Sequence, residues 1–297
     1  MLAGTQTLLS LPETHILRLG IGRGGEQLFS CFRRKALLDS LQAELRPLTA
    51  QRESQRYFLS RTELVQNMVN LLDTAALEGG YAGWVEKTPE HIFYVSQIEA
   101  QFPDARFVHV VRDGRSVVAS IDEMWVVYTE AWNRWRSLAK QLNDYSHAFR
   151  ALRNSSSGVG KKVNFMELWR MKSLARACLL WNDCMALTGN CNAKSNHLAI
   201  DYDDITSNPA GELKILCEFL EIDFDTRMTQ PEKNVLDLVN PHEKWKQGNT
   251  DPIRSASTAK YDSLPALERE LVRELLDYSG DPNVYLDRIS DRPAHTA

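Results

Sequence analysis

The sequence has no long hydrophobic run and no excess of positive charge. None of its apolar stretches reaches the length of about 18 residues that a membrane-spanning helix needs, and the N-terminal segment lacks the basic and apolar regions of a signal peptide. The formal net charge is −4, which gives no general attraction to nucleic acids or anionic membranes. We therefore expect a cytoplasmic protein with no nucleic-acid partner and no membrane span.

Cysteine and histidine are too scattered to predict a metal site. The 5 cysteines include no C-x-x-C pair, and the 7 histidines occur singly along the chain, whereas zinc ligands are usually closely spaced in sequence. An odd number of cysteines without an export signal also argues against a disulfide framework. We expect no bound metal, and we interpret the cysteines as small buried apolar residues.

The segment GWVEKTPEHIFYVSQIEAQFP predicts a strand followed by a helix. The strand is expected to end near Lys87. Thr88 is placed as the N-cap and Pro89 at the first helical position, where its missing N–H costs nothing, and the helix is expected to run to about Gln101.

The segment RFVHVVRDGRSVVASIDEMW repeats this arrangement with a stronger strand signal. The near-continuous apolar run 107–111 contains β-branched residues, which is typical of a strand buried on both faces of a parallel sheet. Gly114 is expected to make the turn, and Ser116 to begin the next helix.

The remaining periodic segments extend the alternation of strands and helices. Helical spacing of apolar residues marks four segments, and HLAIDYDDI (197–205) predicts another buried strand before a helix that begins at Pro209. We therefore predict an α/β fold with a parallel sheet flanked by helices, forming a single domain over 1–297 with a variable helical region at about 121–190. The four helical segments are 26–46, 60–78, 126–150 and 164–189.

Three glycines near the N-terminus match the G-x-G-x-x-G pattern of dinucleotide-binding proteins. A dinucleotide fold needs a solid strand before Gly20 and an acidic residue about 20 positions on, at the tip of the next strand. The run 16–19 is short and interrupted by a charge, and Glu44 lies in a segment with helical leucine spacing. A turn before a helix is the favoured interpretation of Gly20, Gly22 and Gly25, and a Rossmann dehydrogenase is the alternative.

A stronger candidate for an anion site follows the strand at 107–111. A glycine-containing turn there can direct backbone N–H groups and the positive end of a helix at an anion. Arg112 could add a bidentate clamp on phosphate, and Ser120 could offer a hydroxyl from the helix. The alternative is that Arg112 only pairs with Asp113 or another neighbouring carboxylate.

Residues 87–120 resemble the core of the sulfotransferases that use 3′-phosphoadenosine-5′-phosphosulfate (PAPS). The family shows K-[TD]-P, then F-P-x-A-[RK]-F, then R-D-[GP]-R-x-x-x-x-S, and this chain has KTP, FPDARF and RDGRSVVAS at similar spacing. Weaker similarities lie in IDYDDITSNPAGELKILCEFLEI and in PHEKWKQG. The resemblance implies a P-loop nucleotide-kinase-like fold in which Arg112 and Ser120 bind the 3′-phosphate.

The N-terminal segment MLAGTQTLLSLPETHIL resembles the part of these enzymes that follows their phosphosulfate-binding loop. That loop, a strand followed by R-S-G-[TS]-T, is expected just before Met1 and is not in the sequence. The glycines at 20–25 cannot replace it, because they follow the P-E-T segment. The resemblance thus predicts a fold that lacks its first strand and loop, and a chain that either recruits another segment into that slot or is poorly stable.

The resemblance also implies catalytic roles. Glu13 corresponds to the base that accepts the proton of the acceptor hydroxyl, and His15 could assist it. Lys87, at a strand end, is suited to an oxygen of the leaving group or the sulfuryl group; the alternative is a surface lysine neutralised by Glu86. Two further candidate phosphate contacts, for which an ordinary surface charge is the alternative, are Arg115 and Lys246.

The function implied is in-line transfer of a sulfuryl group from PAPS to a hydroxyl or amine, with adenosine 3′,5′-bisphosphate (PAP) as product and no metal. The acceptor could be a small molecule, a carbohydrate or a carrier-bound group. The alternative is a truncated or catalytically inactive relative that serves as a nucleotide-binding or scaffold module. The sequence does not indicate an oligomeric state.

Overall fold

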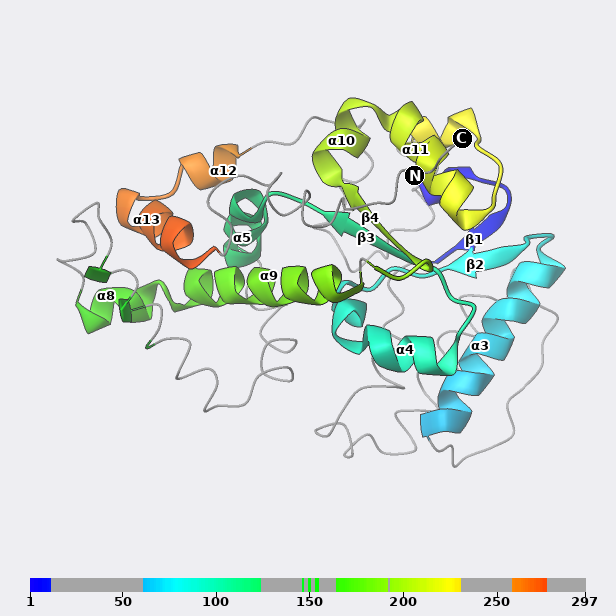
Figure 1. Cartoon of the computed structure of the whole chain (residues 1–297), viewed down its shortest axis with the longest axis horizontal. Coiled ribbons are helices and arrows are strands. Elements are labelled where there is room, and N and C mark those ends of the chain that lie inside the picture. The colour runs from blue at the N-terminus through cyan, green and yellow to red at the C-terminus, as the bar shows by residue number, and fades with distance from the viewer. Residues whose placement is uncertain are drawn as a thin grey trace. The chain divides into compact units, whose positions relative to one another are not determined.

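The computed structural model describes residues 1–11, 61–123, 146, 149–150, 153–154, 164–191, 193–230 and 258–276. In these residues one or more helices separate each strand from the next, as Figure 1 shows. The chain divides into two compact units, the first formed by 1–106 with 205–254 and the second by 107–204 with 255–297. In the described residues each unit contains one two-stranded parallel sheet. The predicted α/β class with parallel strands is confirmed, and the interpretation of 1–297 as one domain stays a prediction.

The sheet of the first unit pairs β1 (Leu8–Ser10) with β2 (Gly83–Val85) in parallel. Helix α3 (Arg61–Glu78) packs against β2 and confirms the helix predicted over 60–78. Its apolar residues recur at helical spacing and form one buried face. The residues of this face are Val65, Met68, Val69, Leu72, Ala75 and Ala76.

The segment after β2 is less regular than predicted. Thr88 precedes the helical segment and Pro89 begins it, as expected, but the first turns form the 3₁₀ helix η3 (Pro89–Tyr94), and only α4 (Val95–Gln101) is α-helical. The prediction of one continuous helix was therefore wrong. Thr88 does not cap it with its side chain, because the hydroxyl donates to Glu86 Oε1 at 2.6 Å.

The first unit also contains η1 (Leu2–Gly4), α11 (Pro209–Leu220) and η5 (Thr226–Thr229). Helix α11 begins at Pro209 as predicted, and the side chain of Asn208 accepts a hydrogen bond from Gly211 N at 3.3 Å. Helix η1 packs against η5, and α11 also contacts η5.

The sheet of the second unit pairs β3 (Phe107–Val111) with β4 (His197–Asp201) in parallel, with Phe107 opposite His197. The predicted strand 107–111 is confirmed, but the expectation that it is buried on both faces was wrong. Val111 is its buried residue, and Val110 is 57% exposed. The described residues give β3 a single strand neighbour, β4, and Val111, at the carboxyl end of the strand, belongs to the core of the unit.

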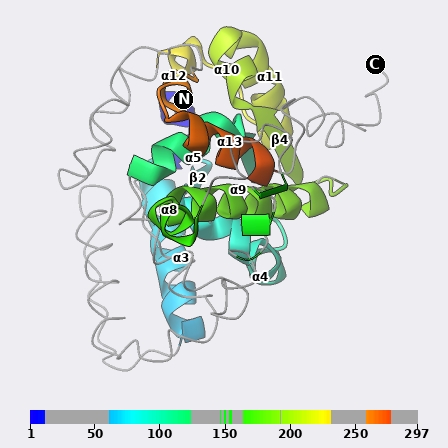
Figure 2. The same cartoon turned by 90° about the vertical axis from the view of Figure 1, so that its left-hand side faces the viewer.

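The other described elements of the second unit are helices. The segment predicted as one helix over 164–189 is interrupted at Met171, so that α8 (Phe165–Arg170) precedes α9 (Lys172–Cys191). Helices α5 (Gly114–Glu123) and α13 (Ala266–Leu275) lie beside α9 in Figure 1 and Figure 2, and α12 (Ala259–Asp262) packs against α5. Helix α10 (Tyr202–Ser207) follows β4 directly.

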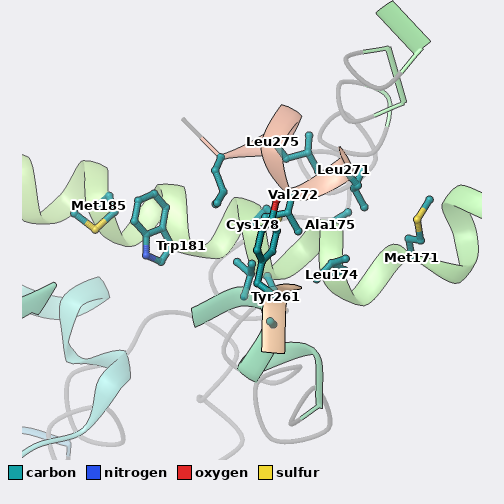
Figure 3. Packing of buried hydrophobic residues seen from close by; sticks show 14 of the residues in the cluster. Met171, Leu174, Ala175, Cys178, Trp181, Met185, Tyr261, Leu271, Val272 and Leu275 are labelled. Atoms are coloured by element: carbon teal, nitrogen blue, oxygen red, sulfur yellow. The ribbon is translucent and has the colours of Figure 1, made fainter. Parts of the chain in front are cut away.

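The core of the second unit is built around one face of α9, shown in Figure 3. Leu174, Cys178, Trp181 and Met185 follow one another at spacings of three and four residues, so they share this face. The side chains that pack against them come from α5, α12 and α13 and include Val118, Tyr261, Leu271, Val272 and Leu275.

Two interpretations of the composition can be checked in the described residues. Cys178, Cys191 and Cys217 are buried, as expected for small apolar residues, but Cys184 is half-buried; none of these four cysteines is in a disulfide. In the part of the chain that the structure describes, no helix has both the length and the apolar character to cross a membrane.

Candidate functional site

The connection between β3 and α5 consists of two residues, Arg112 and Asp113. Asp113 is buried, and its Oδ1 accepts a hydrogen bond from Arg115 N at 2.7 Å. A carboxylate in this position caps the helix and interacts favourably with its positive end. Because Asp113 acts as the cap, α5 begins at Gly114, two residues before the predicted start at Ser116.

Arg115 turns back onto the same carboxylate. Its Nε lies 3.1 Å and 3.0 Å from the two oxygens of Asp113, and its terminal nitrogen lies 2.6 Å from Oδ2. The guanidinium also lies over the ring of Tyr261, 6.0 Å from its centroid. Arg115 therefore has a bidentate partner in the protein, and its role as a phosphate contact stays a prediction.

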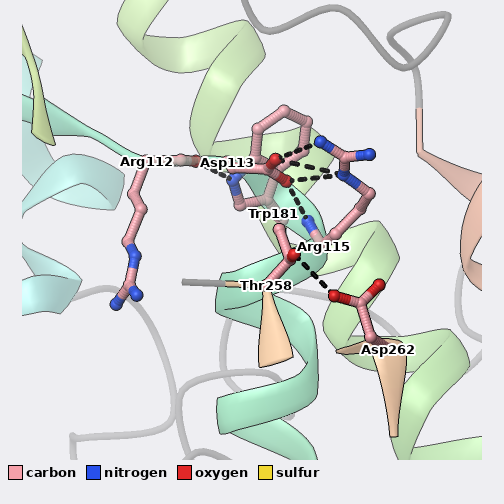
Figure 4. A network of polar contacts seen from close by, with 6 residues as sticks. All are labelled: Arg112, Asp113, Arg115, Trp181, Thr258 and Asp262. Atoms are coloured by element: carbon pink, nitrogen blue, oxygen red, sulfur yellow. Dashed lines mark hydrogen bonds and ion pairs between the residues drawn. The ribbon is translucent and has the colours of Figure 1, made fainter. Parts of the chain in front are cut away.

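Arg112 has a different environment, although it is three residues away. Its side chain points away from the pair formed by Asp113 and Arg115 (Figure 4) and its guanidinium lies over the ring of Tyr202, 4.7 Å from the centroid. Trp181 Nε1 donates to the backbone carbonyl of Arg112 at 3.3 Å, which fixes the backbone of this residue against the core. Arg112 therefore does not share the carboxylate of Asp113 with Arg115. The other part of the alternative, an interaction with another neighbouring carboxylate, applies to Asp203, because the charge of Arg112 opposes the increase in the pKa of that carboxyl that burial causes.

The Nε atom of Arg112 is buried and has no hydrogen-bond partner among the described residues. A buried N–H donor left unpaired costs about 1–3 kcal/mol, and a guanidinium is suited to bidentate binding of phosphate or sulfate oxygens. The arrangement therefore suits a site that an anionic ligand completes.

Carboxylates surround this arginine. Partial burial, followed by repulsion from Asp113, raises the pKa of Asp203, while attraction to Arg112 opposes the increase. Burial likewise raises the pKa of Asp201, at the end of β4. An anion bound at Arg112 would thus be repelled by Asp203, and this repulsion should limit its affinity.

The structure places the other predicted site residues as follows. Ser120 is half-buried on α5, in the same unit as Arg112, and is one turn along from the buried Ser116. Lys87 is exposed just after β2, in the first unit. Outside the described residues lie Glu13, His15, Lys246 and the glycines Gly20, Gly22 and Gly25.

Sequence reasoning missed a buried polar group beside Lys87. The side chain of Glu86 is 2% exposed, and its Oε2 lies 3.1 Å from His91 Nδ1. Its Oε1 accepts the hydrogen bond from the hydroxyl of Thr88. A buried carboxylate of this kind holds an imidazole in one orientation and tautomer. The signal was present as a Glu, a Thr and a His around Pro89, but the pairing depends on the 3₁₀ geometry of η3, which the helical pattern did not predict.

Comparison with known proteins places these features in context. The model of the sulfotransferase family matches residues 12–168, which is more than half of the 297 residues. No curated protein matches the chain.

Two solved structures are similar to this chain. The sulfotransferase domain from the Synechococcus PCC 7002 olefin synthase is 18% identical, with a TM-score of 0.51, and the match covers 92% of this chain and 86% of that domain. The sulfotransferase domain from the curacin biosynthetic pathway is 15% identical, with a TM-score of 0.47, and the match covers 97% of this chain and 89% of that domain. The first of these likenesses supports the same overall fold.

Proposed function

The chain belongs to the sulfotransferase family, and from this premise we propose that it transfers a sulfuryl group from PAPS to a hydroxyl or amine acceptor. In this proposal Arg112 and Ser120 bind the 3′-phosphate, with Arg115 and Lys246 as further contacts. The acceptor is a small molecule, a carbohydrate or a carrier-bound group, and the reaction needs no metal ion.

The observation that carries the proposal is the state of Arg112. Its carbonyl accepts from Trp181, its guanidinium stacks on Tyr202, and its Nε is buried without a hydrogen-bond partner among the described residues. This arrangement fixes the arginine before a ligand binds, which reduces the entropy lost on binding. A phosphate oxygen would supply the missing acceptor.

The proposed chemistry is an in-line displacement at sulfur. The acceptor oxygen or nitrogen attacks sulfur, the bond from sulfur to the 5′-phosphate oxygen breaks, and PAP leaves with the electron pair of that bond. Glu13, assisted by His15, takes the proton of the acceptor, and Lys87 stabilises negative charge on the departing oxygens. By analogy with phosphoryl transfer, positioning and electrostatic stabilisation carry most of the catalysis.

Calorimetric titration of the chain with PAP tests the proposal. We expect micromolar binding that Arg112→Ala weakens by about 10- to 100-fold, because a charge-assisted bidentate contact contributes about 1.5–3 kcal/mol. Arg170→Ala is the matched control, since Arg170 is an exposed arginine on α8. Equal affinity of the wild type and Arg112→Ala would overturn the assignment.

Sulfuryl transfer is then measured with PAPS and a panel of acceptors. Transfer that Glu13→Gln abolishes, with PAP binding retained, supports the catalytic assignment. PAP binding without transfer to any acceptor in the panel would favour the alternative, a nucleotide-binding module.

A further inference from the structure

Three side chains that could bind a metal ion lie together in the second unit. They are His109 on β3, His197 at the start of β4 and Cys191 at the end of α9, and one ligand atom from each lies within 4.8 Å of the other two. Cys191 is 7% exposed and His197 9% exposed, and His109 is half-buried. The sequence did not predict this group, because His109 and His197 are separated by 88 positions.

The register of the sheet brings the two histidines to one face. Phe107 is opposite His197 and His109 is opposite Ala199, and residues two apart on a strand point to the same side. The ring of Phe107 stacks on that of His197 at 4.5 Å and 6°, which holds the His197 ring in place.

The turn between α9 and β4 brings the cysteine to the same place. Lys194 N donates to the carbonyl of Cys191 at 3.0 Å, and His197 N donates to the carbonyl of Lys194 at 3.2 Å. These two hydrogen bonds keep the end of α9 close to the start of β4. The backbone geometry of the group is therefore fixed independently of any ligand.

We propose that His109, His197 and Cys191 bind a zinc ion, with water as the fourth ligand. Two imidazole nitrogens and one thiolate are a donor set that zinc prefers, and three protein ligands leave one coordination position open. Bonds of about 2.0–2.1 Å to nitrogen and 2.3 Å to sulfur put the ligand atoms roughly 3.3–3.6 Å apart in a tetrahedral site. His109 Nε2 and His197 Nδ1, now 2.8 Å apart, would separate by about half an ångström, and Cys191 Sγ, which lies within 4.8 Å of both, would approach them by up to roughly 1.2 Å.

Two protons must move for the three side chains to bind the ion. The hydrogen shared between His109 Nε2 and His197 Nδ1 moves to the other nitrogen of one ring, so both rings stay neutral and each presents a lone pair to the metal. The thiol of Cys191 releases its proton to solvent and binds as a thiolate.

The ion would join the end of α9 to β3 and β4. It would cross-link β3 to the end of α9 and the start of β4, with His109 and His197 88 positions apart in sequence, and metal binding of this kind contributes directly to folding free energy. This site takes no part in the proposed sulfuryl transfer, so either assignment can fail without the other.

Titration of the full chain with Co²⁺, a spectroscopic probe of zinc sites, tests the proposal. We expect one ion per chain, the intense visible absorption of tetrahedral cobalt and a thiolate-to-cobalt charge-transfer band, all removed by adding Zn²⁺. Cys191→Ser should lose the charge-transfer band. Cys184→Ser, on the same helix, should keep it, because Cys184 is not part of the group formed by His109, His197 and Cys191.

A second variant keeps the test valid if Cys191→Ser fails to fold. His109→Gln changes the half-buried ligand, and its far-UV circular dichroism should match that of the wild type while its affinity for Co²⁺ falls at least about tenfold. Absence of a charge-transfer band in the wild type, or an equal band in folded Cys191→Ser, would overturn the zinc site.

Discussion

At the scale of single residues, Arg112 and Arg115 show how surroundings decide what an arginine can do. Both follow the same strand, yet Arg115 is paired bidentately with Asp113, and Arg112 points away from that carboxylate. Arg112 stacks on Tyr202 and keeps a buried N–H without a hydrogen-bond partner among the described residues. The residue that binds an anion should be the one that keeps a buried N–H donor without an acceptor.

Asp203 offers a test of the electrostatics at this arginine. Its carboxylate repels any anion bound at Arg112, so Asp203→Asn should tighten PAP binding by about two- to fivefold, a modest gain because Asp203 is largely exposed. Asp203→Glu keeps the charge and should bind PAP as the wild type does. Calorimetric titration measures both, and weaker binding by Asp203→Asn would mean that the carboxylate helps to organise the site.

The pKa of Asp203 gives this effect a pH dependence. Because the folded-state pKa lies above the ordinary value of 3.8, the carboxyl loses its charge at a higher pH than a normal aspartate as the solution is acidified. The advantage of Asp203→Asn over the wild type should therefore be complete at neutral pH and shrink as pH falls through that pKa. Comparing the two proteins at each pH cancels protonation of the ligand phosphate, and a constant ratio down to pH 3.8 would contradict the shift.

The sequence indicates Arg112 as a candidate anion-binding residue, but it does not describe the environment of its side chain. An arginine directly after an apolar strand can be found from the pattern alone. Tyr202 and Trp181, which orient it, come from β4–α10 and α9, far along the chain. The pairing of Asp113 with Arg115 and not with Arg112 also depends on the backbone path of the two-residue turn, which the spacing of residues in the sequence does not predict.

At the scale of secondary-structure elements, the central residues of strands and helices were predictable from the sequence, and the residues where they begin and end were not. Strand 107–111 and the helix starting at Pro209 follow from apolar runs and proline placement, and both are confirmed. The ends depend on individual side chains, because Asp113 moves the start of α5 and the hydroxyl of Thr88 bonds Glu86 instead of the helix. Local hydrogen bonds of this kind compete with regular structure.

The packing of η1 on η5 leads to a prediction for Gly4. A Cβ added at Gly4 would lie 2.8 Å from both Cα and N of Met228, and neither backbone atom can move away as a flexible side chain would. Gly4→Ala should therefore lower the free energy of unfolding by about 1–3 kcal/mol.

Urea denaturation measures this change, and Gly189→Ala is the matched control. Gly189 is exposed on α9 and a Cβ there meets nothing within 4 Å, so alanine should raise the free energy of unfolding by up to about 1 kcal/mol. An unchanged midpoint for Gly4→Ala would show that η1 does not need its close approach to η5.

At the scale of the whole molecule, α9 connects the features of the second unit. One face supplies the core residues Leu174 and Cys178, Trp181 also bonds the carbonyl of Arg112, and Asn182 donates to the carbonyl of Leu275 at 2.7 Å. The helix ends at Cys191, in the proposed zinc site. Helical periodicity predicted the buried face, whereas these partners come from distant segments and could be found only from the fold.

Substitutions in the core around α9 should change the stability of the protein without changing its affinity for PAP. Leu174 is 1% exposed and lies in the α9 core, so Leu174→Ala should lower the free energy of unfolding by about 2–5 kcal/mol through lost burial and a residual cavity. Leu77→Ala is the control, because Leu77 is 78% exposed on α3 and its loss should change stability by less than about 0.5 kcal/mol.

Both leucine variants should bind PAP with nearly wild-type affinity at a temperature where they are folded, since neither removes a group bonded to Arg112. Denaturation followed by circular dichroism and PAP calorimetry on the same samples test the two parts of this prediction. A large loss of PAP affinity in folded Leu174→Ala would mean that the packing of α9, acting through Trp181, sets the position of Arg112 more strongly than its single hydrogen bond implies.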